Sequence, residues 1–274
     1  MFDPKLLNNG ERLPLKAVLF DFFDTLVLIE GGENFYIPSL KSLHNFLIKK
    51  GVNISFEDFK QAYFEVRDRL YVETAENLEE PHFNIRISET LKKLGYNFSA
   101  SDKIVVKATE AFSDEFMRYV RLDAEASEVL RKLHGKYKLG IVSNFAIPEC
   151  LKKLLEKFNL KEFFDVVAIS GEINRRKPSP EIFQKALEAL QVKASETIFV
   201  GDTLNIDVEG AKNIGIKAIL VKRGKENFTQ DIPKTLIQKQ LEDNTSPKPD
   251  KTIKNLKELL LILENRGIQD NNTY

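Results

Sequence analysis

Residues 18–26 read VLFDFFDTL, an apolar run that ends at Asp21 and continues to Thr25. A short β-branched and aromatic run of this kind is typical of a buried strand, and polar residues directly after it lie at the strand's carboxyl end. Asp21 is therefore a candidate nucleophile. Phe23 stands two residues further along, at a position where a second carboxylate could have acted as its proton-transfer partner.

The rest of the chain repeats this layout. Apolar runs at about 16–20, 138–142, 165–169, 197–200 and 216–221 predict five buried strands. Amphipathic stretches that predict helices separate the last four, at 148–158, 180–190 and 207–214. Strands that alternate with helices predict an α/β fold with a doubly wound parallel sheet, helices on both faces and right-handed crossovers.

A long insertion separates the first strand from the second. Residues 30–125 contain no convincing strand and predict four helices, near 35–51, 55–72, 85–95 and 101–121. Gly51 and Gly95 are expected to end helices, and Ser55 and Ser101 to begin them. We therefore expect an α/β core of residues 1–29 and 126–274 and a second, helical domain of residues 30–125. Gly31 and Gly32 form a candidate hinge.

The C-terminal part is less regular. Residues 224–250 are polar and predict a surface excursion, and residues 250–264 predict a closing amphipathic helix.

Composition excludes several classes of protein. A net charge of +0 with 30% charged residues argues against nucleic-acid binding and against an anionic membrane surface. No apolar stretch approaches the ~18–20 residues of a membrane span, and the N-terminus lacks the apolar segment of a secretory signal. Cys150 is the single cysteine and cannot form an internal disulfide. We expect a soluble, cytoplasmic protein, with Cys150 buried near the start of a helix; its oligomeric state is left open.

Carboxylates gather at the expected strand ends. Asp21, Ser143 and Asp202 each end or directly follow an apolar run, and in an open parallel sheet such positions converge where the strand order reverses. Asp207 adds a third carboxylate. Three acidic groups in one cleft raise one another's pKa values unless a cation neutralises them, and hard oxygen ligands suit Mg²⁺.

Groups that suit an anion complete the predicted site. Lys177, in the KPSP stretch, is expected to be extended before Pro178 and to reach across the strand ends as a point charge. Ser143 and Asn144 can offer a hydroxyl and amides to an anion. Arg175 and Arg176, which precede Lys177, are expected to be solvated.

The four motifs DFFDTL, IVSN, KPSPEIF and GDTLNID resemble those of the haloacid dehalogenase-like hydrolase superfamily, abbreviated HAD. The resemblance covers nearly the whole chain. It implies a Rossmann-like core with an inserted C1-type helical cap. It also implies a Mg²⁺-dependent, phosphatase-like hydrolase that acts through an aspartyl-phosphate on a small phosphorylated metabolite.

The resemblance also implies a role for each motif residue. Asp21 would be the nucleophile, Thr25 would support its loop, and Lys177 would steady Asp21 and the phosphate charge. Ser143, with Asn144 beside it, would bind the transferring phosphoryl group. The metal ligands would be Asp21, the main-chain carbonyl of Phe23, Asp202 and, directly or through water, Asp207.

Phe23 departs from the family pattern. Phosphatases of this family usually read D-x-D-x-T, and the second aspartate is the general acid–base, whose help is worth ~10²–10⁴-fold. Acyl or aryl phosphates, which need no proton on the leaving group, should suffer least from its loss. Two alternatives stay open: a 2-haloacid dehalogenase, and a degenerate domain that binds a phosphorylated ligand or a protein. His44, His82 and His134 adjoin no motif and are expected at the surface or in helix packing.

Overall fold

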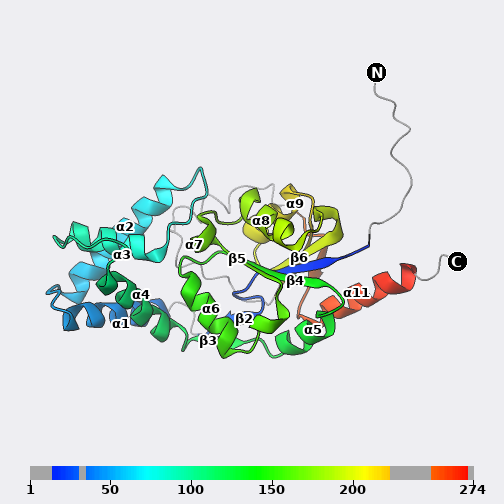
Figure 1. The fold of residues 1–274 in the computed structure, drawn as a ribbon, viewed down its shortest axis with the longest axis horizontal. Helices are drawn as coiled ribbons and strands as arrows, with labels where there is room; N and C mark the ends of the chain where they lie inside the picture. Colours follow the sequence, from blue (N-terminus) through cyan, green and yellow to red (C-terminus); the bar gives the residue numbers. More distant parts are fainter. Residues whose placement is uncertain (1–13, 31–34, 223–247, 271–274) are drawn as a thin grey trace, which may run out of the picture.

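The computed structural model describes residues 14–30, 35–222 and 248–270, with the side chains of the last helix described as far as Glu264. The candidate hinge at Gly31 and Gly32 and nearly all of the expected polar excursion lie outside the described residues. Figure 1 places the helices of the insertion at one end of the molecule and a sheet with its covering helices at the other.

A six-stranded parallel sheet forms the core, in the order β5-β4-β1-β6-β7-β8. The strands are β1 (Ala17–Phe20), β4 (Lys138–Ser143), β5 (Val166–Ile169), β6 (Thr197–Gly201), β7 (Lys217–Val221) and β8 (Lys251–Ile253). Because β1 lies between β4 and β6, the strand order reverses beside it. The predicted doubly wound sheet is confirmed, and all five expected strands are present.

Helices cover both faces of this sheet (Figure 1). One face carries α5 (Ala126–Leu133), α6 (Pro148–Lys157) and α11 (Lys257–Asp270), and the other carries α8 (Pro180–Leu190) and α9 (Glu209–Asn213). Alternate residues of β1 serve the two sides: Val18 and Phe20 pack in the first cluster, and Ala17 and Leu19 in the second. Short helical segments occupy α7 (Ser170–Ile173), Lys161–Phe163, Ala194–Glu196 and Leu204–Val208.

The helices of the insertion, here called the cap, are α1 (Tyr36–Lys49), α2 (Phe56–Glu73), α3 (Phe83–Lys93) and α4 (Lys103–Phe116). Ser55 caps α2 as expected, accepting a hydrogen bond from the Asp58 amide at 3.1 Å. Gly51 and Gly95 follow α1 and α3 with φ of +87° and +88°, the left-handed conformation that favours glycine. Ser101 was expected to begin the fourth helix, but Asp102 is its N-cap residue.

Three short strands and two helix boundaries differ from expectation. β2 (Val27–Ile29) and β3 (Val120–Leu122) form an antiparallel ribbon where the chain enters and leaves the cap. The expectation of a strand-free insertion is therefore wrong at β3, and the expected helix 101–121 ends at Phe116. The expected helix at 250–264 is wrong at its start, because β8 pairs with β7 and α11 begins only at Lys257.

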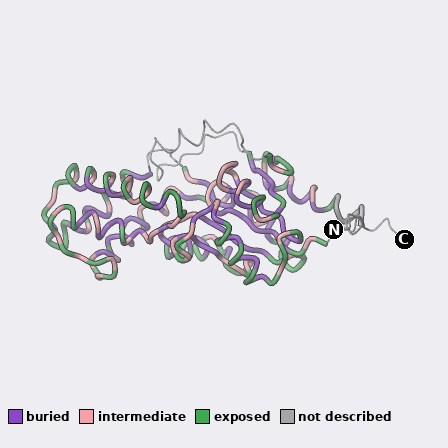
Figure 2. The backbone as a smooth tube through the Cα atoms, turned by 90° about the horizontal axis from the view of Figure 1, so that it is seen from above, coloured by how far each residue is buried: buried purple, intermediate pink, exposed green. Residues whose placement is uncertain are grey.

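Apolar packing is continuous from the sheet into the cap. The cluster that contains Val18 and Phe20 also contains cap residues such as Leu40, Phe59 and Phe112. Figure 2 shows buried backbone both in the sheet and on the inward sides of the cap helices. Among the described helices, none is both long and apolar enough to span a membrane.

Candidate active site

The predicted site residues meet at the carboxyl end of the sheet, where the strand order reverses. Asp21 follows β1, Ser143 ends β4 and Asp202 follows β6. The Asp21 amide donates to the Val200 carbonyl at 2.8 Å, which holds the loop after β1 against β6. Carboxylate oxygens of Asp21, Asp202 and Asp207 all lie within 4.8 Å of one another.

Lys177 bridges two of these carboxylates. Its Nζ donates to Asp21 Oδ1 at 2.6 Å and to Asp207 Oδ1 at 2.7 Å, and the residue is 2% exposed. When all three carboxyl groups are ionised, one cation among them leaves the cluster negatively charged. Buried charge of this kind is costly unless a further cation compensates it.

The pKa values reflect this arrangement. Burial raises the pKa of Asp21 to about 7 against the lowering effect of Lys177, and the charge of Asp207 adds to the rise. Burial and the charges of Asp207 and Asp21 raise the pKa of Asp202 well above its usual range. For Lys177, burial favours the neutral amine, but Asp207 and Asp21 outweigh it and raise its pKa.

The main chain of Lys177 is held by Asn144. The Asn144 Oδ1 accepts from the Lys177 amide at 2.7 Å, and its Nδ2 donates to the Lys177 carbonyl at 3.0 Å. Both side-chain polar atoms of Asn144 therefore position the lysine. Binding of a phosphoryl group by Asn144, as the resemblance implies, would have to use its main-chain amide.

Asp207 is fixed by its own turn. Its Oδ2 accepts from the amides of Asp202 and Thr203, each at 3.0 Å, while its Oδ1 accepts from Lys177. Gly201 makes this approach possible, because a Cβ at that position would lie 2.5 Å from the Asp207 carboxyl. With both oxygens already engaged, Asp207 suits a metal contact through water better than a direct one.

Ser143 offers an unused hydroxyl at the site. It is fully buried, and its Oγ has no hydrogen-bond partner among the described residues. Buried polar atoms in native structures are nearly always paired, so an unpaired hydroxyl at the end of β4 suits a bound ligand. Thr25 is also fully buried, in the turn after β1.

Phe23 lies in an aromatic cluster. Its ring centroid is 5.1 Å from that of Phe22, 4.7 Å from that of Phe145 and 5.8 Å from that of Phe116. Phe116 ends the cap helix α4, so this cluster joins cap and core. The sequence indicates neither Phe116 nor Phe145 as a neighbour, because both contacts depend on the tertiary fold.

Arg176 is a correction to the sequence prediction. It is 6% exposed rather than solvated, and its guanidinium donates to the Thr74 Oγ1 and carbonyl at 3.0 Å each. Arg175 is partly exposed and pairs with Glu79 at 3.2 Å. The two arginines therefore differ, although nothing in the local sequence separates them.

The carboxylate cluster fits Mg²⁺. The ion prefers oxygen ligands, and Asp21, Asp202 and Asp207 each present a carboxylate oxygen within 4.8 Å of the others. The residual negative charge and the raised pKa of Asp21 are what a cation-binding site would have before the ion arrives. Asp21, Asp202, the Phe23 carbonyl and Asp207 through water are the residues that would hold it.

The remaining singled-out residues lie apart from this cluster. His44 is buried in the cap with its Nε2 2.9 Å from the Ile54 carbonyl, His82 caps α3, and His134 follows α5. Cys150 is buried in the first turn of α6, as expected, and burial raises the pKa of its thiol to about 12.

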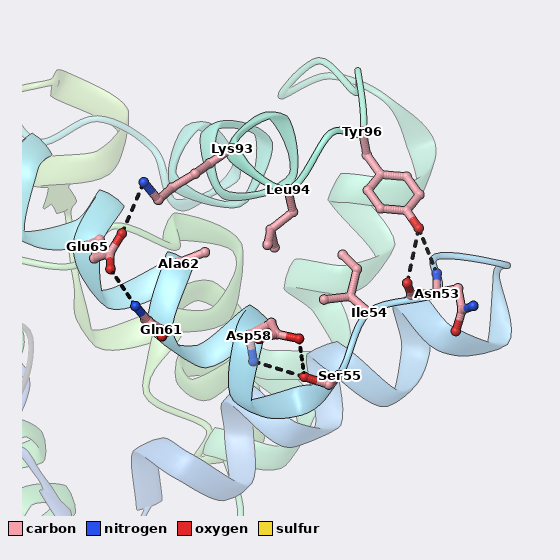
Figure 3. A pocket seen from close by; sticks show the side chains of 10 residues that line it. All are labelled: Asn53, Ile54, Ser55, Asp58, Gln61, Ala62, Glu65, Lys93, Leu94 and Tyr96. Atoms are coloured by element: carbon pink, nitrogen blue, oxygen red, sulfur yellow. Dashed lines mark hydrogen bonds and ion pairs between the residues drawn. The ribbon is translucent and has the colours of Figure 1, made fainter.

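A separate pocket of about 540 Å³ lies between the α1–α2 turn, α2 and the end of α3. Figure 3 shows that its polar groups pair with one another: Lys93 with Glu65, and Ser55 with Asp58. Polar groups that already satisfy one another leave little for a ligand, so this pocket is not a candidate active site.

Comparison with known proteins identifies the family. The family model for haloacid dehalogenase-like hydrolases matches residues 15–215, and a HAD-hydrolase-like model matches residues 174–259. The chain belongs to the haloacid dehalogenase-like hydrolase family and is a hydrolase. It is 32% identical over 212 residues to a glyceraldehyde 3-phosphate phosphatase of Pyrococcus abyssi, covering 77% of this chain and 83% of the relative.

Solved structures share the fold. A HAD phosphatase from Thermococcus onnurineus matches with a TM-score of 0.59 and 24% identity, over 91% of this chain and 98% of its own. A 2-haloacid dehalogenase from Pseudomonas syringae matches with a TM-score of 0.64 and 23% identity, over 92% and 99%. Both a phosphatase and a dehalogenase have this architecture, so the fold does not distinguish the two activities. Only the residues of the site can distinguish them.

Proposed function

We propose that this protein is a Mg²⁺-dependent phosphatase that acts on a small phosphorylated metabolite through an aspartyl-phosphate at Asp21. The observation that carries the proposal is the ion-paired cluster in which Lys177 bridges Asp21 and Asp207 beside Asp202. The similarity to a glyceraldehyde 3-phosphate phosphatase supports a phosphate ester as the substrate class.

Each residue of the cluster has a part in the proposed reaction. The Asp21 carboxylate attacks phosphorus, the ester P–O bond breaks, and the leaving oxygen takes its proton from water. Lys177 favours the ionised form of Asp21 and orients it, and the Ser143 hydroxyl donates to a phosphoryl oxygen. Water then attacks the phosphorus of the aspartyl-phosphate, which releases phosphate and restores Asp21. Mg²⁺, when bound, would offset the negative charge of the phosphoryl oxygens and of the carboxylates.

Phe23 narrows the range of substrates in this proposal. With no carboxylic acid at this position, a poor leaving group such as an alkoxide departs without a positioned proton donor, which removes ~10²–10⁴-fold of catalysis. Aryl and acyl phosphates should therefore react faster than alkyl phosphates.

The carboxylates also argue against dehalogenation. A 2-haloacid carries its own carboxylate, and Asp202 and Asp207 would repel it in a cluster that holds one lysine. The Pseudomonas syringae dehalogenase shares the fold with this chain at 23% identity, which does not carry over its activity.

Phosphate release tests the proposal. An aryl phosphate should release phosphate in the presence of Mg²⁺, glyceraldehyde 3-phosphate, which is an alkyl phosphate, should do so more slowly, and chelation should stop both reactions. The rate of Asp21→Asn should fall to background, while Asp68→Asn, whose half-exposed side chain on α2 pairs with Arg67, should keep the wild-type rate. Turnover that survives both chelation and Asp21→Asn would contradict the proposal, and so would chloride release from 2-chloropropionate with a chelator present.

A further inference from the structure

Arg176 reaches from the core into the cap. Its Nη1 donates to the Thr74 Oγ1 at 3.0 Å and also to the Glu79 carbonyl, and its Nη2 donates to the Thr74 carbonyl at 3.0 Å. The guanidinium lies over the ring of Tyr71, 4.5 Å from its centroid. Such a planar, forked donor satisfies several oxygens at once, which a lysine could not do.

These contacts cap the C-terminus of α2. The helix has 18 residues, Thr74 is its C-cap residue, and its last turn contains no basic residue. The last carbonyls of a helix lack intrahelical partners and carry partial negative charge, which a cation stabilises. The core therefore supplies, through Arg176, the cation that α2 does not supply for itself.

The chain from Thr74 to Phe83, here named the docking segment, contacts the core at further points. The Arg176 amide donates to the Leu78 carbonyl at 2.8 Å, and the Phe83 amide donates to the Ala146 carbonyl at 2.9 Å. His82 lies 3.0 Å from the Glu149 carboxylate of α6. In Figure 1 this segment extends from the cap helices toward α7 of the core.

Both core loops that meet the docking segment also carry site residues. Arg176 is bonded directly to Lys177, whose main chain is clamped by Asn144 and whose amine bridges Asp21 and Asp207. Moving the docking segment away would leave the Arg176 guanidinium without these oxygens, and a buried cation without partners is costly.

We propose that Arg176 is a positioning residue: because it anchors the cap on the core, it also fixes the position of Lys177. The coupling to catalysis rests on the proposed function, whereas the anchoring of the docking segment does not. With Arg176 intact, the docking segment is held on the core and Lys177 is held on Asp21. Without it, the segment separates more often and Lys177 is less well placed.

Hydrogen exchange tests the anchoring without any turnover. In Arg176→Met, the amides of Leu78 and Phe83, which donate to the Thr74 and Ala146 carbonyls, should exchange at least tenfold faster than in the wild type. Arg175→Met is the matched control and should stay within threefold, because a partly exposed ion pair contributes little. Equal exchange in Arg176→Met and wild type would overturn the anchoring.

A second set of measurements tests the coupling. The ¹³Cε resonance of Lys177, assigned by its loss in Lys177→Met, should shift in Arg176→Met and stay in place in Arg175→Met. With an aryl phosphate, Arg176→Met should lower kcat about tenfold and raise KM, and Arg176→Lys should restore part of the loss. An unmoved resonance would overturn the coupling. Absence of turnover in the wild type would instead count against the proposed function.

Thr74→Val is a second test of the proposal that does not depend on Arg176→Met being folded. It removes one acceptor of Arg176 from the cap side while keeping the size of the side chain. Faster exchange in the docking segment together with a shifted Lys177 resonance is expected, and a variant identical to wild type in both would overturn the proposal.

Discussion

At the scale of single residues, the proposed function makes Phe23 the residue that limits protonation of the leaving group. Its ring packs against Phe145 and Phe116, so a carboxylate placed there would be surrounded by apolar rings. Burial of that kind raises a carboxyl pKa and keeps the group protonated near neutral pH, as a general acid requires. Phe23→Asp should therefore increase the rate of hydrolysis of alkyl phosphates roughly tenfold or more. The same substitution should lower the free energy of unfolding by about 2–4 kcal/mol.

The comparison variant for this prediction is Phe23→Leu, which keeps an apolar side chain but brings no acid. Rates on alkyl and aryl phosphates, measured with thermal unfolding, separate the two effects. An equal gain in Phe23→Leu would show that extra space, and not a proton donor, raised the rate.

Asp24 is the nearest alternative source of a proton. It adopts a left-handed φ of +53°, and its Oδ1 accepts from the Ile29 amide at 3.3 Å, within the turn that leads to β2. Asparagine tolerates this conformation and can accept the same hydrogen bond. We expect Asp24→Asn to keep kcat on an aryl phosphate within about threefold at neutral pH. A collapse of activity comparable with that of Asp21→Asn would assign the proton transfer to Asp24.

Residue-level prediction from the sequence succeeded where strand ends bring side chains together. Asp21, Asp202 and Asp207 converge because parallel strands share one edge of the sheet, and Lys177 reaches them across it. Arg176 could not be predicted, because its partner Thr74 lies 102 residues earlier in the chain. Its burial follows from how the cap docks and not from its neighbours in sequence.

At the scale of elements, the turn after β6 depends on Gly201. A Cβ there would lie 2.5 Å from the Asp207 carboxyl, so Gly201→Ala should push Asp207 off the Asp202 and Thr203 amides. The expected result is a loss of about 1–3 kcal/mol in stability together with weaker Mg²⁺ binding. Isothermal titration with Mg²⁺ and thermal unfolding measure the two effects.

Gly51→Ala is the control for that prediction. Gly51 has open space for a Cβ but a positive φ, so the substitution should cost about 1 kcal/mol and leave Mg²⁺ binding unchanged. Unaltered Mg²⁺ affinity in Gly201→Ala would contradict a role for Asp207 in placing the metal.

Helices and strands could be predicted from the sequence only where the apolar pattern extends over enough residues to show a period. The five strands of 4–6 residues and the four cap helices follow from apolar periodicity. β2, β3 and β8 are too short for a period to appear, and each owes its existence to pairing with a partner strand. Pairing of β3 with β2 joins Val27 to Leu122 across the whole cap, and no local pattern reports a contact between positions so far apart.

At the scale of the whole molecule, the carboxylate cluster links stability to pH. The pKa of Asp21 is about 7 in the fold against an ordinary value of 3.8, so between about pH 4 and 7 the folded state keeps a proton that the unfolded state has released. Stability then falls as pH rises through this window, by roughly 1.4 kcal/mol for each pH unit. The raised pKa of Lys177 acts only at much higher pH.

Asp21→Asn tests this contribution, because asparagine resembles the protonated acid. Titrating groups outside the cluster are common to both proteins, whereas the variant also removes the Asp21 charge that helps to raise the pKa of Asp202. In metal-free buffer the variant should match the wild type near pH 4.5 and exceed it by a few kcal/mol at pH 8. Mg²⁺ should reverse the order at pH 8, because only the wild type has the full set of carboxylates that the ion neutralises. Denaturant unfolding of both proteins at both pH values, with and without Mg²⁺, measures these differences. If the wild type has a higher free energy of unfolding than Asp21→Asn at pH 8 without metal, Lys177 alone compensates the charge of the cluster. The site would then have no electrostatic need for a further cation.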